Sequence, residues 1–385
     1  MVSYLANTYA QLPVTVDRGE GSLLYDPQGK AYIDLTSGIG VCTLGYADPQ
    51  WLAAVTEQLR KVSHVCNLYE CDPRQRLAGC LCDATGMKKV FFSNSGAEAN
   101  ECAIKAARKY AAAAKGEEYH YILTLKGSFH GRTLATLSAT GQDIFHSQFQ
   151  PLPPGFCHAA ADSILDVERC IRDYPLAGIL LECIQGESGV RVLERSFVRH
   201  VAQLAGQEGI PLMIDEVQTG NGRTGKLYSY MHYGITPDIL STAKGLGGGL
   251  PIGATLLGEK LQDVFCPGDH GSTFGGNPVS CAGALCVLDR LDKTMMEQVL
   301  TKGEYIRSVL TGAPGIRSVS GMGLMLGVET EKDAKAVQRE CLQNGVLVLT
   351  AKERLRLLPP LNIPLPLLQT AIDVLRSACA VKAPF

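Results

Sequence analysis

Residues 238–249 read Asp238-Ile239-Leu240-Ser241-Thr242-Ala243-Lys244-Gly245-Leu246-Gly247-Gly248-Gly249. The apolar run at the start of this stretch, Asp238 to Thr242, predicts a buried strand. Upstream, Pro211-Leu212-Met213-Ile214-Asp215 predicts a second one that ends in a carboxylate. Four more short apolar runs alternate with amphipathic helical segments; they are Val90–Phe92, Tyr121–Leu125, Gly178–Ile184 and Gly253–Leu257. This alternation predicts an α/β fold with a mostly parallel sheet covered by helices on both faces.

Both ends of the chain predict a smaller α+β domain. Residues 23–35 indicate a β-hairpin with Pro27 and Gly29 in its turn, and Asp48 then caps a helix that begins at Pro49. A long helical stretch, Val279 to Asp292, precedes three further strands; they are predicted near Ile316–Ser320, Leu324–Glu329 and Val346–Thr350. We expect residues 1–50 to complete the small domain, 51–276 to form a large cofactor-binding domain, and 277–385 to form the small domain.

Composition excludes several classes of protein. The chain has 385 residues, 46% of them hydrophobic, and a net charge of -2 without a cluster of basic and aromatic residues, so we expect no nucleic-acid partner. The apolar stretch Leu176 to Ile184 is interrupted by Glu182 and is too short to span a bilayer. The first eight residues lack the features of a leader, so we expect a soluble cytoplasmic protein.

Cysteines and histidines point to no metal site or disulfide framework. The 14 cysteines include no Cys-x-x-Cys pair, and the eight histidines show no His-Glu-x-x-His motif. We expect reduced thiols and nominate no metal ligand.

Chemistry is expected where the predicted strands end. Ligands of parallel sheets bind at the carboxyl ends of strands, and both Asp215 and Lys244 fall at such ends. The glycines after Lys244 let the backbone run close to a planar ligand, and burial would lower the pKa of its amine. An imine-forming lysine, an aspartate for a pyridine nitrogen and a helix N-terminus for a phosphate are the parts that pyridoxal phosphate requires.

The helix N-terminus is predicted at Ser95-Gly96-Ala97-Glu98. Ser95 and Glu98 have the spacing of a capping box, and the small residues Gly96 and Ala97 leave the first amides open to an anion. An ordinary capped helix without a ligand is the alternative, and taken alone it is the commoner case.

Several polar and aromatic residues are candidates for ligand contacts. Phe129 is placed to stack on a ring, Arg132 to bind a carboxylate, and Gln218 to reach a ring oxygen. Arg356 lies in an apolar setting, where it needs an acidic partner or a carboxylate ligand. As isolated residues, Phe129 and Arg132 are more often simply core and surface.

One competing motif lies at Gly220 to Leu227. It matches the phosphate-binding loop of nucleotide hydrolases up to Lys226, but Leu227 offers no hydroxyl for magnesium. A nucleotide-binding protein therefore remains as an alternative from a different class.

The chain resembles the class III (ω-) aminotransferases of the pyridoxal phosphate fold type I along nearly its whole length. The motifs that carry the resemblance are Ser37–Val41, Asn94–Glu101, Phe129–Thr133, Ile184–Glu187, Asp215–Gly220, Gly222–Gly225, Ala243–Gly245 and Ser272–Pro278.

The resemblance implies a role for each matching residue. Lys244 would bind the cofactor covalently and Asp215 would face its ring nitrogen, with catalysis resting on both. The other expected cofactor contacts are Ser95, Gly96, Ala97, Phe129, Gln218 and Thr273. The expected substrate contacts are Arg132, Glu187, Ser272 and Arg356, with Arg356 paired to Glu187 when it does not hold a substrate carboxylate. Thr273 would reach the cofactor of a neighbouring subunit, which implies a homodimer with shared sites.

The resemblance also implies the reaction. It is transfer of the δ-amino group of N-acetylornithine to 2-oxoglutarate in arginine biosynthesis, because Gly38 stands where enzymes acting on free ornithine have a tyrosine. Succinylornithine, N-succinyl-diaminopimelate, ornithine and 4-aminobutyrate remain alternative donors. Tyr46, Cys183 and Ser188 depart from the usual pattern, with a possible effect on substrate preference alone.

Overall fold

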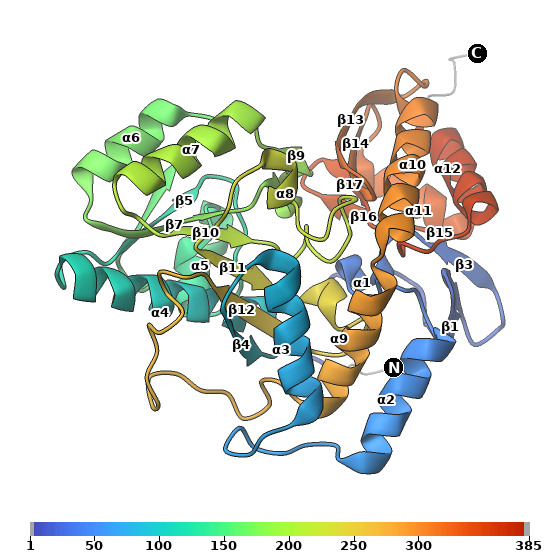
Figure 1. Ribbon diagram of the computed structural model, residues 1–385. Helices are drawn as coiled ribbons and strands as arrows, with labels where there is room; N and C mark the ends of the chain where they lie inside the picture. The colour runs from blue at the N-terminus through green and yellow to red at the C-terminus, as the bar shows by residue number, and fades with distance from the viewer. Residues whose placement is uncertain (1–3, 381–385) are drawn as a thin grey trace.

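The centre of the computed structural model, which describes residues 4–380, is a seven-stranded sheet (Figure 1). The strand order is β4-β12-β11-β10-β7-β5-β6, and β12 alone runs antiparallel to its neighbours. The strands are β4 Lys89–Ser93, β5 Tyr121–Leu125, β6 Phe156–Ala159, β7 Leu176–Leu181, β10 Leu212–Asp215, β11 Ile239–Thr242 and β12 Gly253–Leu257. The predicted mostly parallel sheet is confirmed. Met1 to Ser3, part of the stretch expected to lack a leader, lie outside the described residues.

Two details of this sheet differ from the prediction. Strand β6 was not predicted, because only Cys157 and Ala159 of its four residues are buried and so it carries no continuous apolar run. The run Gly178 to Ile184 is not one strand. It divides at the buried Glu182 into β7 and the short β8 Ile184–Gln185, which pairs with β9 Arg191–Val192 away from the main sheet.

Helices cover both faces of the sheet, so that every residue of β7, β10, β11 and β12 is buried. Leu180, Met213 and Ile239 face α4 Gly96–Lys115 and pack on its alanines. Their strand neighbours Leu181, Ile214 and Leu240 face the opposite way. They pack with α3 Asp72–Thr85, α6 Ile164–Asp173, α7 Arg195–Gln207 and α9 Pro278–Arg290. Figure 1 shows α4 on the side of the sheet opposite α6 and α7. Because both faces are covered, polar ligands can reach the sheet only at its strand ends.

Two further four-stranded sheets lie beside the large one. The first has the order β1-β2-β3-β15, from Arg18–Glu20, Leu23–Tyr25, Ala31–Asp34 and Val346–Leu347. The second has the order β13-β14-β17-β16, from Ile316–Met322, Met325–Thr330, Arg354–Leu357 and Leu349–Ala351. The predicted N-terminal hairpin is thus confirmed. The single strand expected at Val346–Thr350 is two strands in different sheets, since β15 pairs with β3 and β16 pairs with β17.

Helix starts follow their caps. Asp48 accepts hydrogen bonds from the backbone N–H of Gln50 and Trp51, so α2 Pro49–Lys61 begins where predicted. Asn277 caps α9 in the same way. The remaining helices are α1 Ser37–Gly40, α5 Leu134–Ala139, α8 Tyr230–Tyr233, α10 Lys293–Leu310, α11 Ala334–Gln343 and α12 Leu365–Cys379, with 3-10 turns η1 Asp143–Phe145, η2 Gly186–Ser188 and η3 Lys244–Leu246.

We propose that the boundary between the two domains lies after α9, and not between residues 276 and 277 as expected from the sequence. Cys281 and Ala284 of α9 belong to the core of the large sheet, whereas Ile33, Leu35 and the strands and helices after Met295 share a second core. This packing supports a boundary after α9 and places the N-terminal hairpin with the small domain. Within residues 4–380, every helix is too short or too polar to cross a membrane.

Candidate active site

The carboxyl ends of β10 and β11 bring the two expected catalytic residues together. The strands are parallel neighbours with Asp215 opposite Ser241, and Lys244 follows β11 in the turn η3. Lys244 has a φ of 45°, a left-handed conformation that a lysine rarely adopts. Two side chains stabilise the turn, because Asn221 donates to the carbonyl of Ala243 at 3.1 Å and Thr43 donates to that of Gly245 at 2.7 Å. Such strain is typical of functional sites.

Asp215 lies in a hydrogen-bond network in which, within residues 4–380, Nε2 of His130 has no hydrogen-bond partner. The side chain of Asp215 is 4% exposed, and its Oδ2 accepts from Asn100 Nδ2 at 2.7 Å and from His130 Nδ1 at 2.9 Å. Oδ1 accepts from the backbone N–H of Val217 at 2.9 Å, and Ser241 donates to Asn100 Oδ1 at 2.6 Å. These donors satisfy the hydrogen-bonding capacity of a buried carboxylate and fix its orientation. The sequence assigned no role to Asn100 or His130, although both lie within the quoted motifs.

Charges around Lys244 set the protonation of the site. Burial lowers the pKa of the Lys244 ammonium, opposed by the negative charges of Glu187 and Asp215. Glu182 is a further residue that sequence reasoning missed. Burial, together with the charge of Asp215, raises its pKa well above the ordinary value. Its Oε2 accepts from the backbone N–H of Phe129 at 3.3 Å. The site therefore contains a lysine of lowered pKa beside a carboxyl group of raised pKa.

A second cluster lies on the side of the small domain. Arg356 of β17 is 3% exposed and forms an ion pair with Glu187 of η2, so the expected pair is present. The same nitrogen donates to Gln218 Oε1 at 3.1 Å, and Gln218 Nε2 donates to Glu187 at 3.3 Å. Burial alone would raise the pKa of Glu187, but the charge and hydrogen bond of Arg356 outweigh it and lower the pKa. Gln218 thus faces this cluster, and its contact with a ring oxygen stays a prediction.

The first turn of α4 lies beside these residues. Ser95 accepts from the N–H of Glu98 at 3.2 Å as the capping box predicts, but the Glu98 carboxylate returns to the N–H of Asn94 and not to that of Ser95. A Cβ on Gly96 would lie 2.5 Å from a methyl group of Val217. A Cβ added at Gly131 would likewise lie only 2.8 Å from the methyl group of Ala97. Only small residues allow the amides of α4 to approach the end of β10 in this way.

The segment with Ser272 and Thr273 lies next to the start of α4. Ser272 Oγ accepts from Asn94 Nδ2 at 3.2 Å and from the N–H of Gly275 at 2.9 Å. Thr273 is exposed, and its side chain has no hydrogen bond with the part of the chain that the structure describes. Arg132 is exposed as well, and its guanidinium lies over the ring of Phe129 at 5.3 Å.

The nucleotide-binding alternative fails on its context. A phosphate-binding loop needs a helix to start at its end, whereas Gly220 to Leu227 is a series of turns followed only by the four-residue α8. Arg223 is buried within this loop and donates to the carbonyls of Leu324 and Pro359. The loop therefore connects the two domains and does not surround a phosphate.

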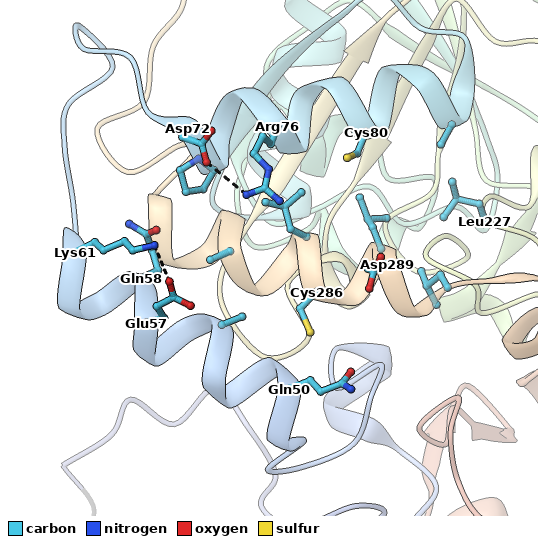
Figure 2. Close-up of a pocket in the computed structure, with 17 residues that line it drawn as sticks. Gln50, Glu57, Gln58, Lys61, Asp72, Arg76, Cys80, Leu227, Cys286 and Asp289 are labelled. Carbon is cyan, nitrogen blue, oxygen red and sulfur yellow. Dashed lines mark hydrogen bonds and ion pairs between the residues drawn. The ribbon is translucent and has the colours of Figure 1, made fainter.

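A cavity of about 730 Å³ between α2, α3 and α9 lies apart from these residues (Figure 2). Four of its charged side chains form two ion pairs, Lys61 with Glu57 at 2.7 Å and Arg76 with Asp72 at 3.5 Å. None of the candidate site residues lines it.

Comparison with known proteins agrees with this geometry. A family model described as aminotransferase class-III matches residues 4–379. The chain belongs to this family. It is similar to the acetylornithine aminotransferases of Haemophilus ducreyi, at 47% identity over 97% of this chain and 95% of that protein, and of Aquifex aeolicus, at 45% identity over 97% and 99%.

Solved structures give the same result. N-acetylornithine aminotransferase from Stenotrophomonas maltophilia aligns with a TM-score of 0.84 at 34% identity, covering 96% of both chains. An ornithine aminotransferase from Toxoplasma gondii, described with pyridoxal phosphate at its active site, aligns with a TM-score of 0.93 at 30% identity, covering 98% of this chain and 92% of that one. The chain is therefore an aminotransferase with the fold predicted from its sequence.

Proposed function

We propose that this enzyme transfers the δ-amino group of N-acetylornithine to 2-oxoglutarate, with pyridoxal 5'-phosphate as cofactor. The products are N-acetylglutamate 5-semialdehyde and glutamate, which places the reaction in arginine biosynthesis. The observation that carries the proposal is the convergence of Asp215, Lys244 and the first turn of α4 at one end of the sheet, in a chain 47% identical to a protein named acetylornithine aminotransferase.

The residues present fit the cofactor. The buried carboxylate of Asp215 suits a protonated ring nitrogen, and the backbone N–H groups in the first turn of α4, where the side chains are as small as Gly96 and Ala97, suit a phosphate. Phe129 would lie on the ring face and Gln218 near the ring oxygen, with Ser95 at the phosphate. When bound, pyridoxal phosphate withdraws electrons from the carbon that carries the transferred amine.

Lys244 is proposed to carry the proton transfers. Its lowered pKa favours the neutral amine, which can bind the cofactor as a nucleophile and later accept a proton from the substrate carbon. Asp215, oriented by Asn100 and His130, would face the ring nitrogen. Burial raises the pKa of Glu182, which favours its protonated form, and in that form it would add no second negative charge beside Asp215.

The two arginines are proposed to bind substrate carboxylates. Arg132 is exposed and without an acidic partner among residues 4–380, so it is free to receive a carboxylate in both half-reactions. Arg356 would bind glutamate or 2-oxoglutarate after releasing Glu187, and would return to Glu187 when N-acetylornithine occupies the site. One pocket can in this way accept two substrates that differ in charge.

We propose a cytoplasmic homodimer in which Ser272 and Thr273 complete the partner's site. Support comes from exposed apolar side chains near this segment, Phe274 at 59% and, in the loop before α3, Leu68 at 90% and Tyr69 at 65%. Asn67 of that loop donates to the carbonyl oxygens of Ser272 and Gly275, so the two segments form one surface. Apolar side chains gathered in this way are typical of a protein interface.

Donor preference follows from the turn at Ser37 to Gly40, which packs beside η3. Gly38 has a φ of 62°, and it offers no side chain to the ammonium group of free ornithine. The test is kcat/KM for N-acetylornithine and for ornithine, with 2-oxoglutarate as acceptor. We expect N-acetylornithine to be preferred, and a preference for ornithine would favour the activity named for the Toxoplasma gondii structure.

A further inference from the structure

Three side chains from two segments of the chain form a stack beside the site. The guanidinium carbon of Arg132 lies 4.2 Å from the ring centre of Phe145 and 5.3 Å from that of Phe129. The two rings are 5.9 Å apart and nearly perpendicular, at 80°. Arg132 thus contacts two aromatic rings but, within residues 4–380, forms no ion pair or hydrogen bond.

Residues before and after Phe145 in the chain hold its backbone in place through side-chain hydrogen bonds. On one side, Gln142 Nε2 donates to the carbonyl of Ser128 at 3.1 Å. On the other, His146 Nε2 lies 2.9 Å from the carbonyl oxygen of Leu137 and 2.7 Å from that of Thr140, at the end of α5. Phe145 itself is only half buried, while its neighbour Ile144 is 78% exposed. The ring is therefore held toward Arg132 although the segment lies at the surface.

Stacking and carboxylate binding use different parts of a guanidinium. An aromatic ring contacts its face, whereas a carboxylate accepts from the N–H groups along its edge. An exposed arginine otherwise loses much rotamer freedom when it binds a ligand. A ring that already orients Arg132 reduces this loss and leaves its donors available.

We propose that Phe145 is a positioning residue that orients Arg132 for the substrate carboxylate. The inference rests on the proposed function, because that function gives Arg132 a carboxylate to bind. It adds a specific role for a residue outside the motifs that identify the family.

The test uses the holoenzyme and two ligands that cannot react. N-acetylnorvaline has the skeleton of N-acetylornithine without the transferable amine, and N-acetylnorvalinamide lacks the carboxylate as well. Calorimetric titration gives Kd for both with the wild type, Phe145→Leu, Phe145→Tyr and Arg132→Ala. Ile144→Ala, one residue away and exposed, is the matched control.

We expect Phe145→Leu to weaken carboxylate binding about fivefold or more, the range of a cation–π contact, and to leave carboxamide binding unchanged. Phe145→Tyr and Ile144→Ala should bind as the wild type does, and Arg132→Ala should lose the preference for the carboxylate. Unchanged Kd values in Phe145→Leu, or an equal loss for both ligands, would overturn the proposal. Two further results would overturn it: a wild type that binds both ligands equally well, or an Arg132→Ala variant that keeps the wild-type preference for the carboxylate. Either result would mean that Arg132 does not bind the carboxylate.

The outcome is separable from that of the proposed function. An enzyme that prefers free ornithine in turnover would defeat the proposed donor, while the ratio of carboxylate to carboxamide binding would still report on Phe145. Conversely, a confirmed donor with an unchanged ratio in Phe145→Leu would defeat only the positioning role.

Discussion

The proposed cofactor end of the site, around Asp215, and the proposed substrate end, around Arg132 and Arg356, are built in opposite ways. Around Asp215, both carboxylate oxygens have fixed partners, and one of these partners, Asn100, is itself held by Ser241. At the proposed substrate end, Arg132 contacts two aromatic rings and forms no ion pair within residues 4–380, and Arg356 of β17 pairs with Glu187 of η2. The first arrangement suits a group that stays bound, and the second suits ligands that come and go.

The difference has an energetic basis. Pre-organised donors around a buried charge cost no reorganisation during a reaction, so a permanent cofactor benefits from a rigid network. An arginine that must bind one substrate and ignore another needs an alternative partner of similar strength, because a buried unpaired guanidinium is costly. Glu187 provides that partner for Arg356.

The largest effect is expected from a substitution in the rigid network around Asp215. Asp215→Asn keeps the shape but removes the charge, so Asn100 and His130 remain while the ring nitrogen loses its anionic partner. We expect transamination to fall roughly a hundredfold or more, with some cofactor still bound. Steady-state turnover and the absorption spectrum of the purified variant check this, and undiminished turnover would show that Asp215 does not face the ring.

A smaller effect is expected at the proposed substrate end, where loss of Arg356 should slow one half-reaction more than the other. In Arg356→Ala the glutamate half-reaction loses a bidentate contact with a carboxylate, worth about 2 kcal/mol or roughly thirtyfold. The N-acetylornithine half-reaction should lose much less, because Arg356 is then paired with Glu187. Single-turnover kinetics of each half-reaction measure both losses, and equal losses would make Arg356 part of a structural ion pair only.

The sequence predicted some features of the fold and site and missed others. Features with a local sequence pattern or a family motif were predicted, and those that depend on distant partners were not. Lys244 and Asp215 end continuous apolar runs, so their place at the strand ends could be read directly, and the ion pair of Arg356 with Glu187 was expected from the family resemblance. Asn100, His130 and Glu182 were missed because their partners are 30 to 115 residues away in the chain, and no local pattern reports such contacts. The division of Val346 to Thr350 between two sheets was missed for the same reason, since pairing partners and not periodicity decide it.

A substitution of Asn100, which holds Asp215, should affect the stability of the protein more than its choice of amino donor. Asn100→Ala removes a donor to Asp215 and leaves the hydroxyl of Ser241 without its acceptor in a buried site. We expect the free energy of unfolding to fall by about 1–3 kcal/mol and the N-acetylornithine to ornithine preference to stay unchanged. Urea unfolding and the ratio of kcat/KM values test the two halves of this prediction, and a shifted preference would mean that the network also shapes the substrate end.

The smallest expected effect concerns Glu182, which lies between the two ends. Its pKa is raised in the folded protein, so above about pH 4.5 the unfolded chain releases this proton while the folded protein retains it. Glu182 therefore costs stability as pH rises toward its folded pKa. Glu182→Gln keeps an acceptor for the N–H of Phe129 without the charge, and we expect it to gain roughly 1 kcal/mol relative to the wild type between pH 5 and pH 8. Urea unfolding at both pH values measures this gain, with the exposed Glu259→Gln as control. A difference between Glu182→Gln and the wild type that does not change with pH would show that Glu182 is ionised in the folded protein, and that the site tolerates a second negative charge beside Asp215.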